Sequence, residues 1–163
     1  MMFRARRPSR ISDMPAIAKP RWIRKGYEGM TFFGHIITHC EQDAAAFNRS
    51  CSALKHHEMI HLYQARSTHD SWLCFYARYL YYWLTASRYH RRLRHAGYLL
   101  NPFELEAYAH MHDPAYPPSG DVAVEWKNYA KMSMAERFTH YASIMQQNQN
   151  NMQQNQKQKN LVH

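Results

Sequence analysis

The chain has 163 residues, a formal net charge of +9 at pH 7 and 45% hydrophobic residues. This length suits one domain with a hydrophobic core and is too short for two ordinary domains. Eight arginines and lysines fall within the first 25 positions, so much of the positive charge belongs to an N-terminal arm. We therefore expect residues 1–25 to form a flexible basic leader, which lacks the continuous apolar stretch of a secretory signal.

Cysteine usage bears on the compartment. Cys40, Cys51 and Cys74 are odd in number and lack the close spacing of a redox pair or a zinc knuckle. They do not describe a disulfide framework, which favours a reducing, cytoplasmic location. The arginine-rich, acid-poor leader is also compatible with targeting to an organelle.

The first predicted elements are a strand and a helix. β-branched and aromatic residues crowd Thr31 to Thr38, which predicts one strand of a small sheet. Asp43 is suited to cap a helix that begins with the run AAAF and ends near Arg66.

A strongly aromatic segment, SWLCFYARYLYYWLTASRYHRR, begins at Ser71. Its large side chains at helical spacing are Trp72, Phe75, Tyr76, Tyr79 and Trp83, with Leu73, Leu80 and Leu84 on an adjoining face. This pattern predicts a helix buried in the core. Arg78 and Arg88 exclude a membrane span, which needs about 20 apolar residues, but the Trp and Tyr content is compatible with peripheral membrane contact through residues 72–94.

Capping signals mark two further helices. Asn101 is suited to the N-cap and Pro102 to the first position of a helix that carries FELEAY. Ser133 and Glu136 form a capping box before a final helix.

The remaining segments complete the predicted organisation. Residues 121–126 are a candidate second strand. Residues 146–160 are nearly all Gln and Asn, so we expect residues 146–163 to form a disordered tail. Residues 26–145 are then one mainly helical α+β domain, in which a small sheet packs on the helix of His57.

The residues that carry chemistry are His57, Glu58 and His61, which match the pattern H-E-x-x-H. On a helix the two histidines lie about 40° apart on one face, near enough to bind one Zn²⁺ through ring nitrogens. Zinc lowers the pKa of a water that it binds toward 7, and Glu58 is placed to take the proton as general base. Gln64 joins the histidine side of the same helix.

A catalytic zinc site needs a third protein ligand, and the downstream helix offers two. Glu104 and Glu106 lie about 200° apart on that helix, so only one can face the metal. Glu104 is preferred because it shares a face with the small Ala107, which allows close approach of the two helices. Glu106 remains the alternative, as do His110 and His112.

H-E-M-I-H followed by a helix bearing E-L-E-A-Y resembles the gluzincin zinc metallopeptidases. In that group the second helix supplies a glutamate from an E-x-x-[AS]-[DN] pattern, with which Glu104 and Ala107 align. Tyr108 stands where the family has an acidic or amide residue. Residues 26–112 also look like small, uncharacterised bacterial proteins with H-E-x-x-H and F-E-x-E-A motifs, and this likeness implies a minimal zincin.

The leading hypothesis is a zinc-dependent hydrolase, a metallopeptidase acting on a peptide or protein, with His57, His61 and Glu104 as ligands and Glu58 as general base. Gln64, Tyr108 and His110 are candidates to orient a ligand or to stabilise the transition state. One alternative is a catalytically inactive metal-binding or interaction protein. Another is a basic binder of nucleic acid or an anionic surface, although no specific nucleic-acid target is predicted.

Overall fold

The computed structural model describes residues 16–19, 21–22, 29–49, 52–89 and 95–161, which form three strands and seven helices. The strands are β1 (Ala16–Ala18), β2 (Gly29–Phe32) and β3 (His35–Thr38). The helices are α1 (Glu41–Arg49), α2 (Ala53–Ser67), α3 (Trp72–Tyr89), α4 (Ala96–Leu99), α5 (Pro102–His110), α6 (Trp126–Lys131) and α7 (Met134–Leu161). The mainly helical α+β fold predicted from the sequence is confirmed.

The sheet has the order β1-β3-β2, with β1 parallel and β2 antiparallel to β3. The prediction of one strand from Thr31 to Thr38 was wrong, because the chain reverses at Phe33 and Gly34. Both residues have positive φ angles, 44° and 85°, as a two-residue hairpin turn of the primed type requires. Glycine adopts such a φ without strain, so Gly34 fixes the register of the hairpin.

β1 lies inside the segment predicted to be a flexible leader, so that prediction fails for residues 16–18. The backbone of Ala16 makes two hydrogen bonds to the side chain of Asn48 in α1, at 2.8 and 3.2 Å. β1 also pairs with β3 along its whole length. These contacts between distant segments order a stretch that has no strong local signal of its own. Residues 1–15, 20 and 23–25 of the predicted leader lie outside the described residues.

The prediction of one helix from Asp43 to Arg66 was also wrong, because α1 and α2 are separate. α1 already begins at Glu41, so Asp43 lies in its first turn. α2 has its own N-cap, Ser52, whose hydroxyl accepts a hydrogen bond from the backbone of Lys55 at 3.1 Å. Ser52 satisfies an N–H that has no partner within the helix, and so it sets where α2 starts.

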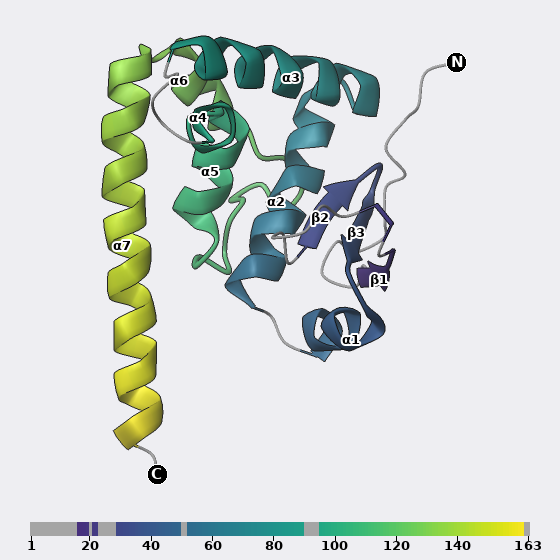
Figure 1. The fold of residues 1–163 in the computed structure, drawn as a ribbon, viewed down its shortest axis with the longest axis vertical. Helices are drawn as coiled ribbons and strands as arrows, with labels where there is room; N and C mark the ends of the chain where they lie inside the picture. The colour runs from purple at the N-terminus through teal and green to yellow at the C-terminus, as the bar shows by residue number, and fades with distance from the viewer. Residues whose placement is uncertain (1–15, 20, 23–28, 50–51, 90–94, 162–163) are drawn as a thin grey trace.

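Figure 1 shows α2 running down the middle of the molecule, between the sheet on one side and α5 and α7 on the other. α3 crosses the top of this view, and α7 runs along the left side. Phe103 of α5 is fully buried at the centre of the core, where its ring meets those of Phe75 and Trp126 at centroid distances of 5.0 and 4.5 Å. α2 is therefore enclosed over most of its length.

α3 is only half enclosed, contrary to the predicted burial. Trp72 and Phe75 are buried, but Leu73, Leu80 and Leu84 are exposed. None of the helices in the described part of the chain is long and apolar enough to cross a membrane.

The predicted caps of the last helices are confirmed. Asn101 accepts a hydrogen bond from the backbone of Phe103 at 3.2 Å, and Pro102 follows at the first position of α5. Ser133 and Glu136 make the reciprocal bonds of a capping box before α7.

Two predictions for this half of the chain were wrong. Residues 121–124 are not a strand. Residues 146–161, predicted to be disordered, continue α7, because Ile144 is buried and Asn148 donates to the backbone carbonyl of Tyr108 in α5 at 3.1 Å.

Candidate metal centre

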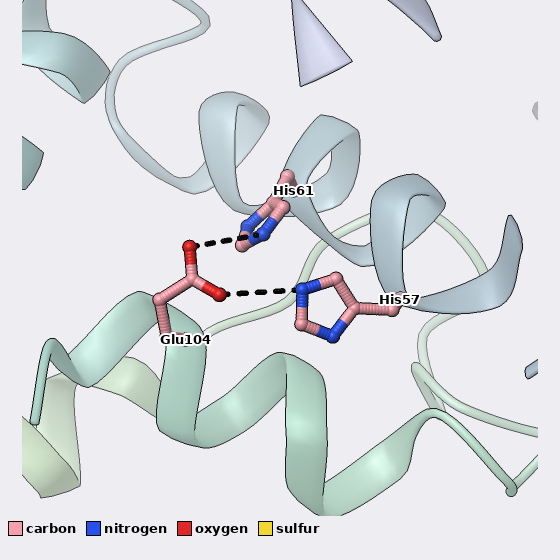
Figure 2. Close-up of side chains that lie close together, drawn as sticks. All are labelled: His57, His61 and Glu104. Atoms are coloured by element: carbon pink, nitrogen blue, oxygen red, sulfur yellow. Dashed lines mark ion pairs between the residues drawn. The ribbon is translucent and has the colours of Figure 1, made fainter. Parts of the chain in front are cut away.

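Two histidines of α2 and one glutamate of α5 converge at the centre of the molecule. His57 and His61 lie one helical turn apart, with their rings nearly perpendicular and their centroids 4.9 Å apart. Figure 2 shows both rings directed toward the carboxylate of Glu104, which comes from the facing helix. All three residues are at least 94% buried.

The distances within the triad join Nε2 of each histidine to one carboxylate oxygen. His57 Nε2 lies 3.2 Å from Glu104 Oε2, and His61 Nε2 lies 3.5 Å from Glu104 Oε1 (Figure 2). One ligand atom from each of the three residues can be chosen so that all lie within 4.8 Å of one another. The three side chains thus surround one point.

The electrostatics of the triad are those of a buried ion pair. Burial alone would lower the pKa of His61, but the negative charges of the nearby Glu104 and Glu58 and the contact with Gln64 together outweigh burial and raise this pKa to about 9. For Glu104, burial would raise the pKa, but the positive charge of His61 and the closeness of both histidine Nε2 atoms hold it well below its usual range. In the protein without metal, a protonated His61 therefore faces an ionised Glu104 at neutral pH.

Gln64 determines which nitrogen of His61 faces the triad. Its amide nitrogen donates to two acceptors, the backbone carbonyl of Phe103 at 2.8 Å and Glu106 Oε2 at 2.6 Å. Its oxygen must then face His61 Nδ1, which lies 2.8 Å away. Nδ1 therefore carries a proton, and Nε2 is the nitrogen whose lone pair a metal can take.

Glu106 holds the Gln64 amide in this orientation. Its other oxygen, Oε1, accepts hydrogen bonds from the Tyr116 hydroxyl at 2.5 Å and the backbone N–H of Glu125 at 2.6 Å. Burial raises the pKa of Glu106 despite these bonds. Glu106 is thus fully engaged with groups outside the triad, and the structure places Glu104, rather than Glu106, opposite the histidines.

Two tyrosines border the triad. Tyr79 of α3 donates its hydroxyl to Glu104 Oε1 at 2.6 Å, which holds the carboxylate in place. Tyr108 packs its ring against that of His57, with centroids 4.5 Å apart. The Tyr108 hydroxyl lies 3.3 Å from that of Tyr98.

Glu58 is held by the sheet. Thr31 of β2 donates its hydroxyl to Glu58 Oε2 at 2.8 Å and lies equally close to the Glu58 backbone carbonyl. This contact fixes the rotamer of a carboxylate that follows directly on His57 in α2. Glu58 is buried, and its negative charge is one of the influences that raise the pKa of His61.

The structure does not bring every candidate to the triad. His110 faces away, since its Nε2 lies 2.8 Å from Glu125 Oε2 and its ring stacks on Tyr116 with centroids 3.7 Å apart. His112 is not among the described groups that could hold a metal. Gln64 and Tyr108 do lie beside the triad, each against one of its histidines.

Two observations indicate that the triad can hold a divalent metal. Glu104 Oε2 and His57 Nδ1 are fully buried and find no hydrogen-bond partner among the described residues, which for Glu104 leaves a strong acceptor unused. Ligand bonds of about 2.0–2.2 Å in a tetrahedron place neighbouring ligand atoms about 3.3–3.6 Å apart. The two measured nitrogen-to-oxygen distances, 3.2 and 3.5 Å, fall close to that range.

Three contributors were missed by the sequence analysis: Thr31, Tyr79 and Glu106 in its anchoring role. Tyr79 was interpreted as a core residue because it shares helical spacing with Phe75. Its hydroxyl reaches Glu104 only through the packing of α3 on α5, and no local pattern reports such a contact.

A comparison of the chain with protein-family models, with curated proteins and with solved structures finds no match.

Proposed function

We propose that the chain is a zinc-dependent hydrolase, a metallopeptidase of the gluzincin type. The observation that carries this proposal is the convergence of His57, His61 and Glu104 around one point, with Glu58 next to the first histidine. Two imidazoles and one carboxylate are the ligand set of several catalytic zinc sites, and they leave the fourth position open. No other described group of three histidines, cysteines or carboxylates could hold a metal.

Zinc bound there would supply a Lewis acid and a water that loses its proton near neutral pH. The chain's own residues then have distinct tasks. Glu58, fixed by Thr31, takes the proton from the attacking water and returns it to the leaving amine. Gln64 holds His61 with Nε2 toward the metal, and Tyr79 holds Glu104.

The position of β2 supports a peptide as substrate. β2 is an edge strand of the described sheet and packs beside α2. An extended peptide that paired with this edge would run along the helix that carries Glu58.

The experiment that tests the proposal separates metal binding from catalysis. Elemental analysis should find one zinc per wild-type chain and none in the double variant His57→Ala/His61→Ala. Glu58→Gln should keep the zinc, since Glu58 is not a ligand, and lose at least roughly a hundredfold in peptide hydrolysis, the range of a general base. A Glu58→Gln protein that hydrolyses peptides like wild type would refute the mechanism, and a folded wild type that takes up no zinc would refute the site.

One observation favours a second candidate, a structural zinc site without turnover. All three ligands are almost fully buried, and closed sites are typical of structural zinc. The two candidates differ when zinc is removed with a chelator. A structural site predicts unfolding on removal, whereas a catalytic site predicts a folded protein that regains activity when zinc returns.

A further inference from the structure

α3 presents an apolar face that no described residue covers. Leu73, Leu80 and Leu84 are 64%, 54% and 39% exposed, and Tyr81 beside them is 62% exposed. At 100° per residue, Leu73, Ala77, Leu80, Leu84 and Arg88 fall within about 80° of one another, so they form one stripe. In Figure 1, α3 forms the upper edge of the molecule, and no other element lies above it.

This stripe is separate from the part of α3 that holds the fold together. Trp72, Phe75 and Ala86 are buried and lie on the opposite side of the helix. Tyr79, also on the inner side, reaches Glu104. The exposed leucines are therefore not accounted for by the core, and a continuous exposed apolar stripe of this kind indicates an interaction surface.

The positive charge on α3 favours a partner with a negatively charged surface. The chain has no aspartate or glutamate between Ser71 and Phe103, whereas α3 carries Arg78 and Arg88, of which Arg88 lies on the exposed stripe. A second copy docking through the same face would bring like charges together. Nucleic acid offers phosphates to arginine but nothing that would bury three leucines.

We propose that the exposed stripe of α3, Leu73, Leu80, Leu84 and Arg88 with Tyr81 at its side, docks on the surface of an anionic lipid bilayer. The stripe from Leu73 to Leu84 is about 16 Å long, so α3 lies in the plane of the surface and does not cross it. The leucines enter the boundary between headgroups and acyl chains, and Arg88 pairs with lipid phosphates. Tyr81 and the partly exposed Trp83 have the amphipathic rings that prefer this boundary.

The test uses the full chain and sedimentation with lipid vesicles. One set of vesicles contains phosphatidylcholine alone, and the other contains phosphatidylcholine with phosphatidylglycerol. We expect binding to the anionic set, weaker at high salt, and little binding to the neutral set. The double variant Leu80→Glu/Leu84→Glu should bind the anionic vesicles at least roughly tenfold more weakly, because two leucines no longer enter the lipid and two added carboxylates repel it.

A control for added charge is Met152→Glu in α7, where one other exposed apolar side chain, 52% exposed, is replaced by glutamate. It should bind vesicles like wild type. Circular dichroism and zinc content should be unchanged in both variants, which separates this proposal from the proposed hydrolase, on which it does not depend.

Three outcomes would overturn the docking proposal. The first is a double variant that binds anionic vesicles as tightly as wild type. The second is a Met152→Glu loss equal to that of the double variant, which would mean that added charge anywhere on the chain weakens binding. The third is a wild type that ignores vesicles but forms a dimer that the double variant dissociates, which would assign the stripe to a second copy of the chain.

Discussion

Replacing Glu106 with glutamine tests whether the Gln64 amide selects the ring nitrogen of His61 that a metal can bind. Glu106 Oε2 accepts from the Gln64 amide, whereas Oε1 accepts from Tyr116 and the backbone of Glu125. The variant keeps an oxygen for the two donors at Oε1, so its new NH₂ group must face the NH₂ group of Gln64. Two donors then meet at the 2.6 Å contact. Turning the Gln64 amide over relieves this conflict and places NH₂ against His61 Nδ1.

The turned amide changes the protonation of His61. In wild type the metal-free ring carries protons on both nitrogens, and a metal displaces only the proton on Nε2, which faces Glu104. In the variant Nδ1 must accept a hydrogen bond, so the ring keeps a proton on Nε2 alone, and a metal that takes this nitrogen must also break the new hydrogen bond as the proton returns to Nδ1. Loss of such a supporting partner weakens metal binding about 10- to 100-fold, which corresponds to about 1.4–2.7 kcal/mol. The turned amide also directs its oxygen at the Phe103 carbonyl, so the metal-free fold loses stability as well.

The assay is a zinc titration in competition with a chromophoric chelator, paired with thermal unfolding of the metal-free protein. A second variant tests whether the lost zinc affinity can be restored. Gln64→Glu/Glu106→Gln returns an acceptor to His61 Nδ1 and restores a donor and acceptor pair between positions 64 and 106. It should recover most of the zinc affinity that Glu106→Gln loses. Wild-type zinc affinity in Glu106→Gln, or a rescue variant no better than the single variant, would refute this account of Gln64.

Three further predictions concern single contacts. Tyr79→Phe removes the hydroxyl that holds Glu104, so zinc affinity in the same titration should fall about tenfold, and an unchanged affinity would show that packing alone positions the carboxylate. Thr31→Val frees the Glu58 carboxylate, so peptide hydrolysis should fall while zinc content stays at one per chain; equal loss of both would mean that the change acts on the fold. At the start of α7, hydrogen bonds from the N-cap serine lower the pKa of the Glu136 carboxyl below 4.5, so its contribution to stability is present above pH 4.5 and is lost as the pH falls through the lowered pKa. Glu136→Ala should therefore melt below wild type at neutral pH, with a difference that disappears in strong acid, and a difference independent of pH would contradict this.

The metal triad could be predicted from the sequence because the spacing of residues on a helix fixes which side chains share a face. His61 lies four positions after His57, which places both on one face of any helix that contains them. The same geometry allowed only one of Glu104 and Glu106 to face the metal, and the small Ala107 on the face of Glu104 decided the choice. The structure uses both carboxylates, one toward the histidines and one toward Gln64.

The contacts that support the triad were not accessible, because they join segments far apart in the chain. Tyr79 meets Glu104 across 25 positions, and Thr31 meets Glu58 across 27. The sequence did not predict β1 for the same reason, since its three residues have no strong local pattern and form a strand only by pairing with β3. Local propensity reports caps, such as that of Asn101, but not the packing of one element on another.

The open stripe of α3 leads to a last prediction, which separates docking from folding. A helix that is apolar on all sides is normally enclosed, so the sequence predicted burial for leucines that the structure leaves exposed. Leu80→Glu/Leu84→Glu should then change the free energy of unfolding by no more than about 0.5 kcal/mol per site. Phe75→Ala, in the same helix but 3% exposed, should lose about 3–5 kcal/mol. Denaturant unfolding of both variants and wild type measures the contrast. A loss in the leucine variant as large as that of Phe75→Ala would show that the stripe is enclosed, and it would remove the free surface on which the docking proposal depends.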